Sequence, residues 1–312
     1  MNRNKFYWLL RRELWESRSV WMAPAICGAI IVLAALWAAF GTGNITLQGL
    51  GPEEYAKVHE LTPAKLDAVA SYSVGLIAVP FFVMVLFTQF FYALDALYSE
   101  RRDRSVLFWK SLPISDTETV LSKLVIAGLV MPLAAAAAAL ATQLILAMIA
   151  SAKLAGLGLL QGHLWTASLW GGDVAVMVYL LVASALWYLP LLGWCLLVSA
   201  WAPRSPVMYA TLAPLALGLA EFIAFRSHHV LGAIGSRVGN MELLARSFGG
   251  RHQGAGFGVD IDESHLEVPR RLFDAVDPTA VFSTPTLWVG VVLGIGLVTA
   301  AVYMRRRAGE VA

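Results

Sequence analysis

The sequence predicts an all-α polytopic membrane protein with six transmembrane helices. The chain has 312 residues, of which 58% are hydrophobic and only 14% are charged, whereas a soluble domain has roughly 25% charged residues. Its mean hydropathy is +0.67. Six stretches stay apolar over the roughly 20 residues that a helix needs to cross the hydrocarbon core of a bilayer. We therefore expect a single transmembrane domain over residues 1–312 that lies in a lipid bilayer.

The six spans follow from the spacing of charged residues. Within them, charges occur only near the ends, at Asp95, Lys123 and Glu221. Prolines fall inside five of the spans, and a membrane-embedded bundle tolerates them because neighbouring groups satisfy the freed carbonyls. The spans are expected at residues 20–40, 72–95, 120–152, 174–203, 205–225 and 279–304.

The first span follows a basic segment, so a cleaved signal peptide is an alternative interpretation. Its uncharged run, Val20–Phe40, is longer than the roughly 7–15 residues of a signal-peptide core. No small-residue cleavage site precedes a soluble region. We therefore expect this span to remain in the protein.

The positions of lysine and arginine predict the orientation. Cytoplasmic segments carry an excess of these residues. With the N-terminus inside, the basic N-terminal segment, the cluster at Arg101, Arg102 and Arg104, and the triplet 305–307 all fall on the cytoplasmic side. The sequence therefore predicts a multi-pass protein of the cell inner (cytoplasmic) membrane with both termini in the cytoplasm. Segments 41–71, 153–173 and 226–278 are then extracytoplasmic.

The N-terminal segment 4–19 is expected to form an amphipathic helix on the inner leaflet. Phe6, Leu10 and Leu14 fall on one helical stripe, and two tryptophans suit the headgroup boundary. The candidate interfacial residues are Trp8, Arg11, Arg12, Glu13 and Trp15.

The cytoplasmic region 98–118 contains two expected helical pieces, separated by Pro113. Ser115 and Glu118 have the spacing of a capping box, so the third helix should begin in the cytoplasm near Ser115. A short helix braced by a capped helix suits docking of a cytosolic partner. An ordinary amphipathic loop is the alternative.

Few residues suggest chemistry within the chain. No phosphate-binding loop or catalytic motif is found, and Cys27 and Cys195 lie far apart in apolar runs, where we expect small buried hydrophobes. No standard zinc spacing occurs among the histidines, so we expect no catalytic residue, metal site or bound cofactor. Glu221 is the candidate intramembrane polar site. Its alternative role is a pair with Arg226 at the interface.

The segment after the second span resembles a family motif. Glu100-Arg101, the run 105–107, the run Ser111-Leu112-Pro113-Ile114-Ser115 and Lys123-Leu124 match a pattern of the ABC-2 type transporter permeases. The opening run 10–16 and the long loop before the last span are also similar to that family. Arg104 stands where the family usually has glycine.

The resemblance implies the membrane-spanning subunit of an ATP-driven exporter. The chain would be no enzyme by itself, because ATP and magnesium would bind to a separate ATP-binding subunit. A second permease copy, identical or related, would complete the transporter, and no nucleic acid is implied. The residues that would couple to the ATPase are Glu100, Arg101, Arg102, Asp103, Arg104, Val106, Leu107 and Lys110.

Two other functions remain as alternatives. A secondary transporter would have charged or polar sites near the midplane and internal repeats, and neither is evident in the sequence. A non-transporting membrane assembly factor is the other alternative.

Overall fold

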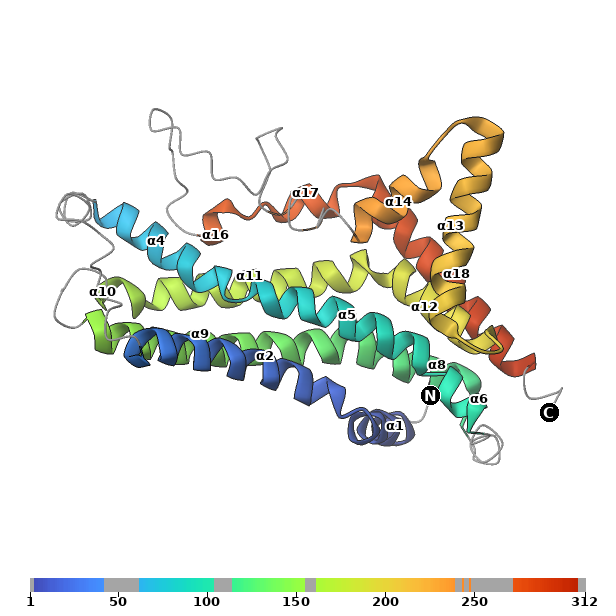
Figure 1. The fold of residues 1–312 in the computed structure, drawn as a ribbon, viewed down its shortest axis with the longest axis horizontal. Coiled ribbons are helices and arrows are strands. Elements are labelled where there is room, and N and C mark those ends of the chain that lie inside the picture. Colours follow the sequence, from blue (N-terminus) through green and yellow to red (C-terminus); the bar gives the residue numbers. More distant parts are fainter. Residues whose placement is uncertain are drawn as a thin grey trace.

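The computed structural model describes residues 3–41, 62–103, 114–154, 161–238, 243, 247 and 272–307. These ranges are helical with short connections, and no strand occurs in them (Figure 1). The elements are α1 (Arg3–Glu16), α2 (Ser19–Leu36), η1 (Trp37–Gly41), α4 (Pro63–Leu76), α5 (Val79–Asp95), α6 (Tyr98–Arg102), α8 (Asp116–Val125), η3 (Ile126–Val130), α9 (Met131–Leu154), α10 (Gln161–Leu164), α11 (Ala167–Trp187), α12 (Leu189–Trp201), α13 (Pro206–Phe225), α14 (His229–Val238), α16 (Leu272–Ala275), α17 (Pro278–Phe282) and α18 (Pro285–Arg307).

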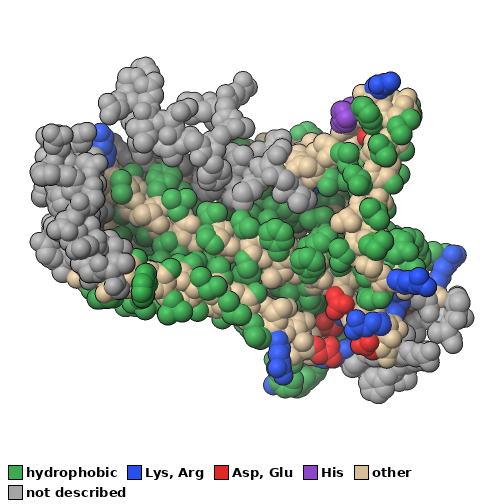
Figure 2. Space-filling model, viewed as in Figure 1, with side chains coloured by type: hydrophobic (Ala, Val, Ile, Leu, Met, Phe, Trp, Pro, Cys, Tyr) green, Lys and Arg blue, Asp and Glu red, His purple; other side chains and the backbone are tan. Residues whose placement is uncertain are grey.

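Six helices in these ranges are long and apolar enough to cross a membrane, which confirms the predicted class of multi-pass helical membrane protein. They are Ser19–Phe40, Pro63–Arg102, Asp116–Ala152, Ala167–Trp187, Pro206–Phe225 and Pro285–Arg307. Figure 2 shows hydrophobic side chains over most of the visible described surface. Most of the visible acidic and basic side chains gather at one end of the bundle, and a few lie at the tip of α13 and at the opposite end. A surface of this kind suits surroundings of lipid.

The fourth predicted span, 174–203, differs most from the structure. Its helix begins earlier, at Ala167, and is divided at Tyr188 into α11 and α12. Pro190 explains the division, because it has no N–H for the turn before it and its ring disturbs that turn. Arg237 of α14 donates from Nη1 to the carbonyl of Trp187 at 2.6 Å, so the broken end of α11 gains a partner.

The helices lie along one long bundle with two distinct ends (Figure 1). At one end, which we call the terminal end, lie α1, α6, the start of α8 and the last turn of α18. At the opposite end lie α10, α16 and the start of α4. α13 rises away from the bundle and packs against α12 and α5 near its start and against α14 near its end.

Small residues allow close packing between α2, α5 and α9. An alanine run in α9 supplies Ala134, Ala135 and Ala139, which are buried beside Phe81 of α5. A Cβ atom at Gly28 of α2 would lie only 2.7 Å from Thr142 Oγ1. The alanines and Gly28 therefore allow α2, α5 and α9 to approach closely.

The pair of glycines in the last span, Gly290 and Gly294, serves two different contacts. A Cβ atom on Gly294 would lie 2.9 Å from Pro190 N and 3.0 Å from the carbonyl carbon of Leu189, so α18 crosses α12 with backbones nearly touching. Gly290 instead makes room for Arg237, whose Nη2 donates to the carbonyl of Thr286 at 2.6 Å. This arginine therefore fastens α14 to α11 and α18.

Gly294→Ala is expected to lower the thermal stability of the purified protein by the equivalent of about 1–3 kcal/mol, the usual cost of overpacking a tight contact. Backbone atoms of α12, rather than a flexible side chain, would have to move. Gly296→Ala is the matched control, because nothing lies within 4 Å of a Cβ atom there. Equal melting temperatures for the two variants in detergent would contradict the close crossing.

Candidate functional site

Five charged side chains meet at the terminal end of the bundle and form what we call the ionic hub: Glu13, Glu100, Asp116, Lys123 and Arg305. Lys123 Nζ lies 3.0 Å from Glu13 Oε1 and 3.0 Å from Glu100 Oε1. Arg305 lies 2.6 Å from Glu100 Oε2 through Nη1 and 3.0 Å from Asp116 Oδ1 through Nε. The hub thus joins α1, α6, α8 and α18 through one connected set of ion pairs.

The hub is removed from solvent. Glu13, Glu100, Lys123 and Arg305 are each no more than 6% exposed, and only Asp116 at the edge is more open. Charges buried in this way are tolerated when they are paired and hydrogen-bonded. Tyr92 of α5 adds a neutral donor, because its hydroxyl lies 3.0 Å from Glu13 Oε2.

Local sequence explains how α8 presents its two hub residues. Ser115 accepts from the Glu118 N–H while Glu118 accepts from the Ser115 N–H, so the predicted capping box is formed. The cap fixes the first turn, where Asp116 lies. Lys123 is seven residues further on, two turns later on the same face of the helix, and therefore enters the hub beside Asp116.

A second group of contacts holds α6 against α12. Arg101 donates from Nη2 to the carbonyls of Ser199 and Ala202, at 2.7 and 2.8 Å, at the end of α12. The Ser199 hydroxyl accepts from the N–H groups of Leu97 and Tyr98. The short helix α6 is therefore fixed on two sides, by the hub and by α12.

The candidate coupling residues divide into three groups. Glu100 and Arg101 point into the protein, where they position α6 rather than present a surface. Arg102 and Asp103 form an exposed pair at 3.0 Å, with both side chains more than half exposed. Arg104, Val106, Leu107 and Lys110 lie outside the described residues.

The candidate interfacial residues also divide by exposure. Glu13 is buried in the hub, whereas Trp8 and Trp15 are 59% and 71% exposed. Arg11 lies over both tryptophan rings, 5.1 and 4.8 Å from their centroids. Arg12 pairs with Glu16 at 3.0 Å on the same helix. One face of α1 thus joins the protein while the other offers aromatic rings and cations to its surroundings.

Beside the hub lies a groove of about 530 Å³ between the α1–α2 junction and α5. Glu16, Arg18 and Asp95 line it together with the aromatic rings of Phe87 and Phe91. It combines charge with apolar walls at the level where α1 meets the bundle. The candidate site therefore includes an accessible polar surface next to its buried charges.

Glu221, the candidate intramembrane polar site, caps a helix. Its Oε1 accepts from the Ser227 hydroxyl and the His229 N–H at 2.6 and 2.8 Å, and its Oε2 accepts from the Val230 N–H at 2.8 Å. These N–H groups belong to the first turn of α14, whose positive end favours a carboxylate. Arg226 instead stacks on Phe222.

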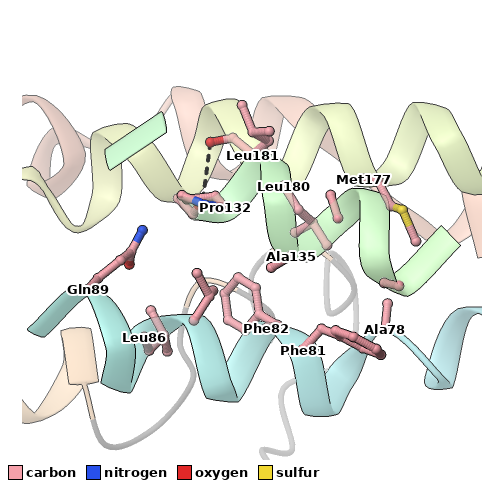
Figure 3. A pocket seen from close by; sticks show the side chains of 14 residues that line it. Ala78, Phe81, Phe82, Leu86, Gln89, Pro132, Ala135, Met177, Leu180 and Leu181 are labelled. Carbon is pink, nitrogen blue, oxygen red and sulfur yellow. Dashed lines mark hydrogen bonds between the residues drawn. The ribbon is translucent and has the colours of Figure 1, made fainter. Parts of the chain in front are cut away.

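A small apolar cavity of about 70 Å³ lies between α5, α9 and α11 (Figure 3). Gln89 closes one end of it, and its Nε2 donates to the carbonyl of Ala127 in η3 at 2.7 Å. Ala78, Pro132 and Ser184 of the lining lie beside the three interruptions of the spanning helices, at 77–78, in η3 and at Tyr188. Ligand pockets are typically about 300–1,000 Å³, so this cavity is too small for a cargo molecule as it stands.

No metal-binding group of three or more histidine, cysteine or acidic side chains occurs within the described ranges. No protein-family model, curated protein or solved structure matches the chain. The arrangement itself therefore carries the functional argument. The ionic hub offers no catalytic chemistry that we identify. Its role is structural, because it joins α1, α6, α8 and α18 next to both ends of the segment 104–113.

Lys123→Met is expected to destabilise the protein by about 3–5 kcal/mol, because two buried carboxylates lose their cation. Arg102→Met is the control. Its side chain is 57% exposed, and exposed pairs contribute only about 0–1 kcal/mol. Thermal unfolding in detergent measures both variants, and a Lys123 variant as stable as the Arg102 variant would show that the hub does not hold the helices.

Proposed function

We propose that this chain is the membrane-spanning permease subunit of an ATP-driven exporter of the ABC-2 type. ATP would be hydrolysed by a separate nucleotide-binding subunit, and a second permease copy would complete the transport path. The observation that carries the proposal is the hub, because it lies at both ends of the segment whose motif resembles the coupling region of that family. The chain's own residues would transmit movement, while the partner supplies ATP chemistry.

The anchoring of segment 104–113 supports this role. On its N-terminal side, Glu100 and Arg101 bind α6 to the hub and to α12. On its C-terminal side, Asp116 and Lys123 bind α8 to the same hub. A partner that moves this segment would therefore move α6 and α8 together, and with them α1 and α18.

The distribution of charge supports a cytosolic partner at the terminal end. Arg101 and Arg102 of α6 and Arg305–Arg307 of α18 lie there with the basic helix α1 (Figure 1), and positively charged segments favour the cytoplasmic side. We therefore assign the terminal end to the cytoplasm and the opposite end to the outside of the inner membrane. In this orientation the exposed Arg102 and Asp103 face the compartment that contains ATP.

The bundle beyond the hub suits a moving transport path. Its spanning helices are joined by apolar contacts and small residues rather than by ion pairs, and three of them are interrupted beside the apolar cavity. Apolar surfaces can repack with little electrostatic cost. We infer that rearrangement of α5, α9 and α11 would widen this cavity, while the hub moves as a unit.

The first test is co-purification. We expect the tagged chain to capture a phosphate-loop ATPase encoded beside its own gene, and Leu107→Asp to abolish this capture by placing a charge in the docking segment. Leu159→Asp is the matched control, in the segment assigned to the opposite side of the membrane. The proposal fails if the chain purifies alone and transports down an ion gradient, or if both leucine variants behave alike.

A second variant separates docking from transmission. Glu100→Gln keeps the docking segment but removes the charge that pairs with Lys123 and Arg305. We expect this variant to retain the ATPase subunit while transport-coupled ATP hydrolysis in proteoliposomes falls severalfold. Asp103→Asn, on the exposed neighbour, serves as the comparison for charge removal outside the hub. Unchanged hydrolysis in the Glu100 variant would contradict the transmitting role of the hub.

A further inference from the structure

A buried polar pair lies far from the hub, near the opposite end of the bundle. Asp173 is on the second turn of α11 and is 7% exposed, and Gln143 of α9 is fully buried. Gln143 Nε2 donates to the Val74 carbonyl at 3.0 Å and lies 3.4 Å from Asp173 Oδ1. The sequence places Asp173 at the edge of an expected span, whereas the structure encloses it among α4, α9 and α11.

Two oxygen atoms of this pair have no hydrogen-bond partner among the described residues: Asp173 Oδ2 and Gln143 Oε1. Both are acceptors, and the Gln143 Nε2 group donates instead to the Val74 carbonyl and to Asp173 Oδ1. Buried polar atoms are nearly always satisfied, so an orphaned pair indicates a bound species that supplies a donor or a positive charge. The polar pair is therefore incomplete as the protein alone presents it.

No cation of the described chain completes the pair. None of the ion pairs found there includes Asp173. An isolated carboxylate taken out of water is costly, and such a group takes up a proton instead of remaining charged. The paired carboxylates of the hub show the contrast, since each of them lies within 3.0 Å of a lysine or arginine.

The number of available oxygen ligands distinguishes a site for a proton from a site for a metal ion. Calcium takes about six to eight oxygen ligands and magnesium about six in strict geometry. Here Asp173 offers two oxygens and Gln143 one, while the Val74 carbonyl already accepts from Gln143. A single proton on Asp173 Oδ2 needs only one acceptor, and Gln143 Oε1 is the acceptor of the pair that has no donor.

We propose that Asp173 and Gln143 form a proton-binding site in which neutral Asp173 donates to Gln143, and that α16 covers this site. The site does not depend on ATP-driven transport and is independent of the hub. One bound proton would provide a hydrogen-bond partner for both oxygens that lack one, Asp173 Oδ2 and Gln143 Oε1. It would also leave no unpaired charge on Asp173 within the bundle.

The cover consists of the side chains of Leu272 and Phe273, which pack directly against Gly75 and Gly172. A Cβ atom on Gly75 would overlap the Leu272 side chain and lie 3.9 Å from Asp173 Oδ1, and one on Gly172 would lie 3.2 Å from Phe273 Cβ. The Leu272 N–H also donates to the Ser71 hydroxyl at 2.8 Å. These contacts close the route from the opposite end to Asp173, so release of the proton to water requires α16 to move.

The other titratable groups on the surrounding helices do not neutralise Asp173. On α4 these are Asp67 and Tyr72, on α10 His163, on α11 Tyr179 and on α16 Asp274, while the side chain of Lys153 at the end of α9 lies outside the described residues. Asp67 is engaged with His163 at 2.5 Å, and Asp274, when ionised, has the same charge as Asp173 and does not neutralise it. Lys65, at the start of α4, is exposed. None of these described groups forms an ion pair with Asp173, and a proton on its carboxyl group would remove its charge.

Infrared spectroscopy of the full chain in lipid tests the site directly. At about pH 5 we expect the carbonyl band of a protonated carboxyl group, lost in Asp173→Asn and retained in Asp95→Asn, which removes an exposed carboxylate. Gln143→Leu should shift the band without removing it, because the carboxyl group loses its acceptor. A band that survives in Asp173→Asn, or no band in the wild type, overturns the proposal.

Chemical labelling tests the cover. A water-soluble carbodiimide, which reacts with protonated carboxyl groups, should label Asp173 slowly in the wild type and much faster in Leu272→Ala. Leu217→Ala, at a 62% exposed position of α13, is the matched control. Equal labelling of Asp173 in the two leucine variants, measured by mass spectrometry, overturns the assignment of α16 as the cover.

Discussion

Lys123 lies between two buried carboxylates, and this arrangement constrains every element at the terminal end. Glu13 and Glu100 come from different helices, and Arg305 extends the set to the last span. Separating any of these helices would leave a buried charge exposed or without its partner. Loss of one partner of a buried ion pair costs about 3–5 kcal/mol of stability. A helix bundle held otherwise by apolar contacts therefore has one end that behaves as a single body.

The remainder of the bundle is held by close packing and by side-chain hydrogen bonds to interrupted helices. Close crossings depend on small residues, as where Gly294 meets the backbone of α12, and interrupted helices recover their hydrogen bonds from side chains. Arg237 serves the broken end of α11, and Gln89 serves the carbonyl freed in η3. Irregular backbone at this depth is tolerated where it is enclosed by protein or lines a cavity. The proposed division of labour, a rigid polar end and a rearranging apolar bundle, rests on this contrast.

The sequence was sufficient for features that depend on neighbours along the chain. Apolar runs predicted the six spanning helices, and the spacing of Ser115 and Glu118 predicted the capping box. The hub was missed because its partners lie about a hundred or two hundred residues apart (Lys123 with Glu13, Arg305 with Glu100). A lone lysine at the start of a span was the available signal. The sequence places Asp173 at the boundary of a span, because a charge next to an apolar run does not reveal that three helices enclose it.

The central claim is that α1, α6 and α18 move together when ATP acts on the partner subunit. Spin labels at the exposed positions Trp15, Arg102 and Tyr303 report on these three helices, and pulsed electron paramagnetic resonance gives the distances between them. In the complex with its ATPase, the account predicts that these distances stay the same with and without a trapped nucleotide, whereas distances from them to a label at Val178 of α11 change. Independent movement of α1, α6 and α18 would contradict it.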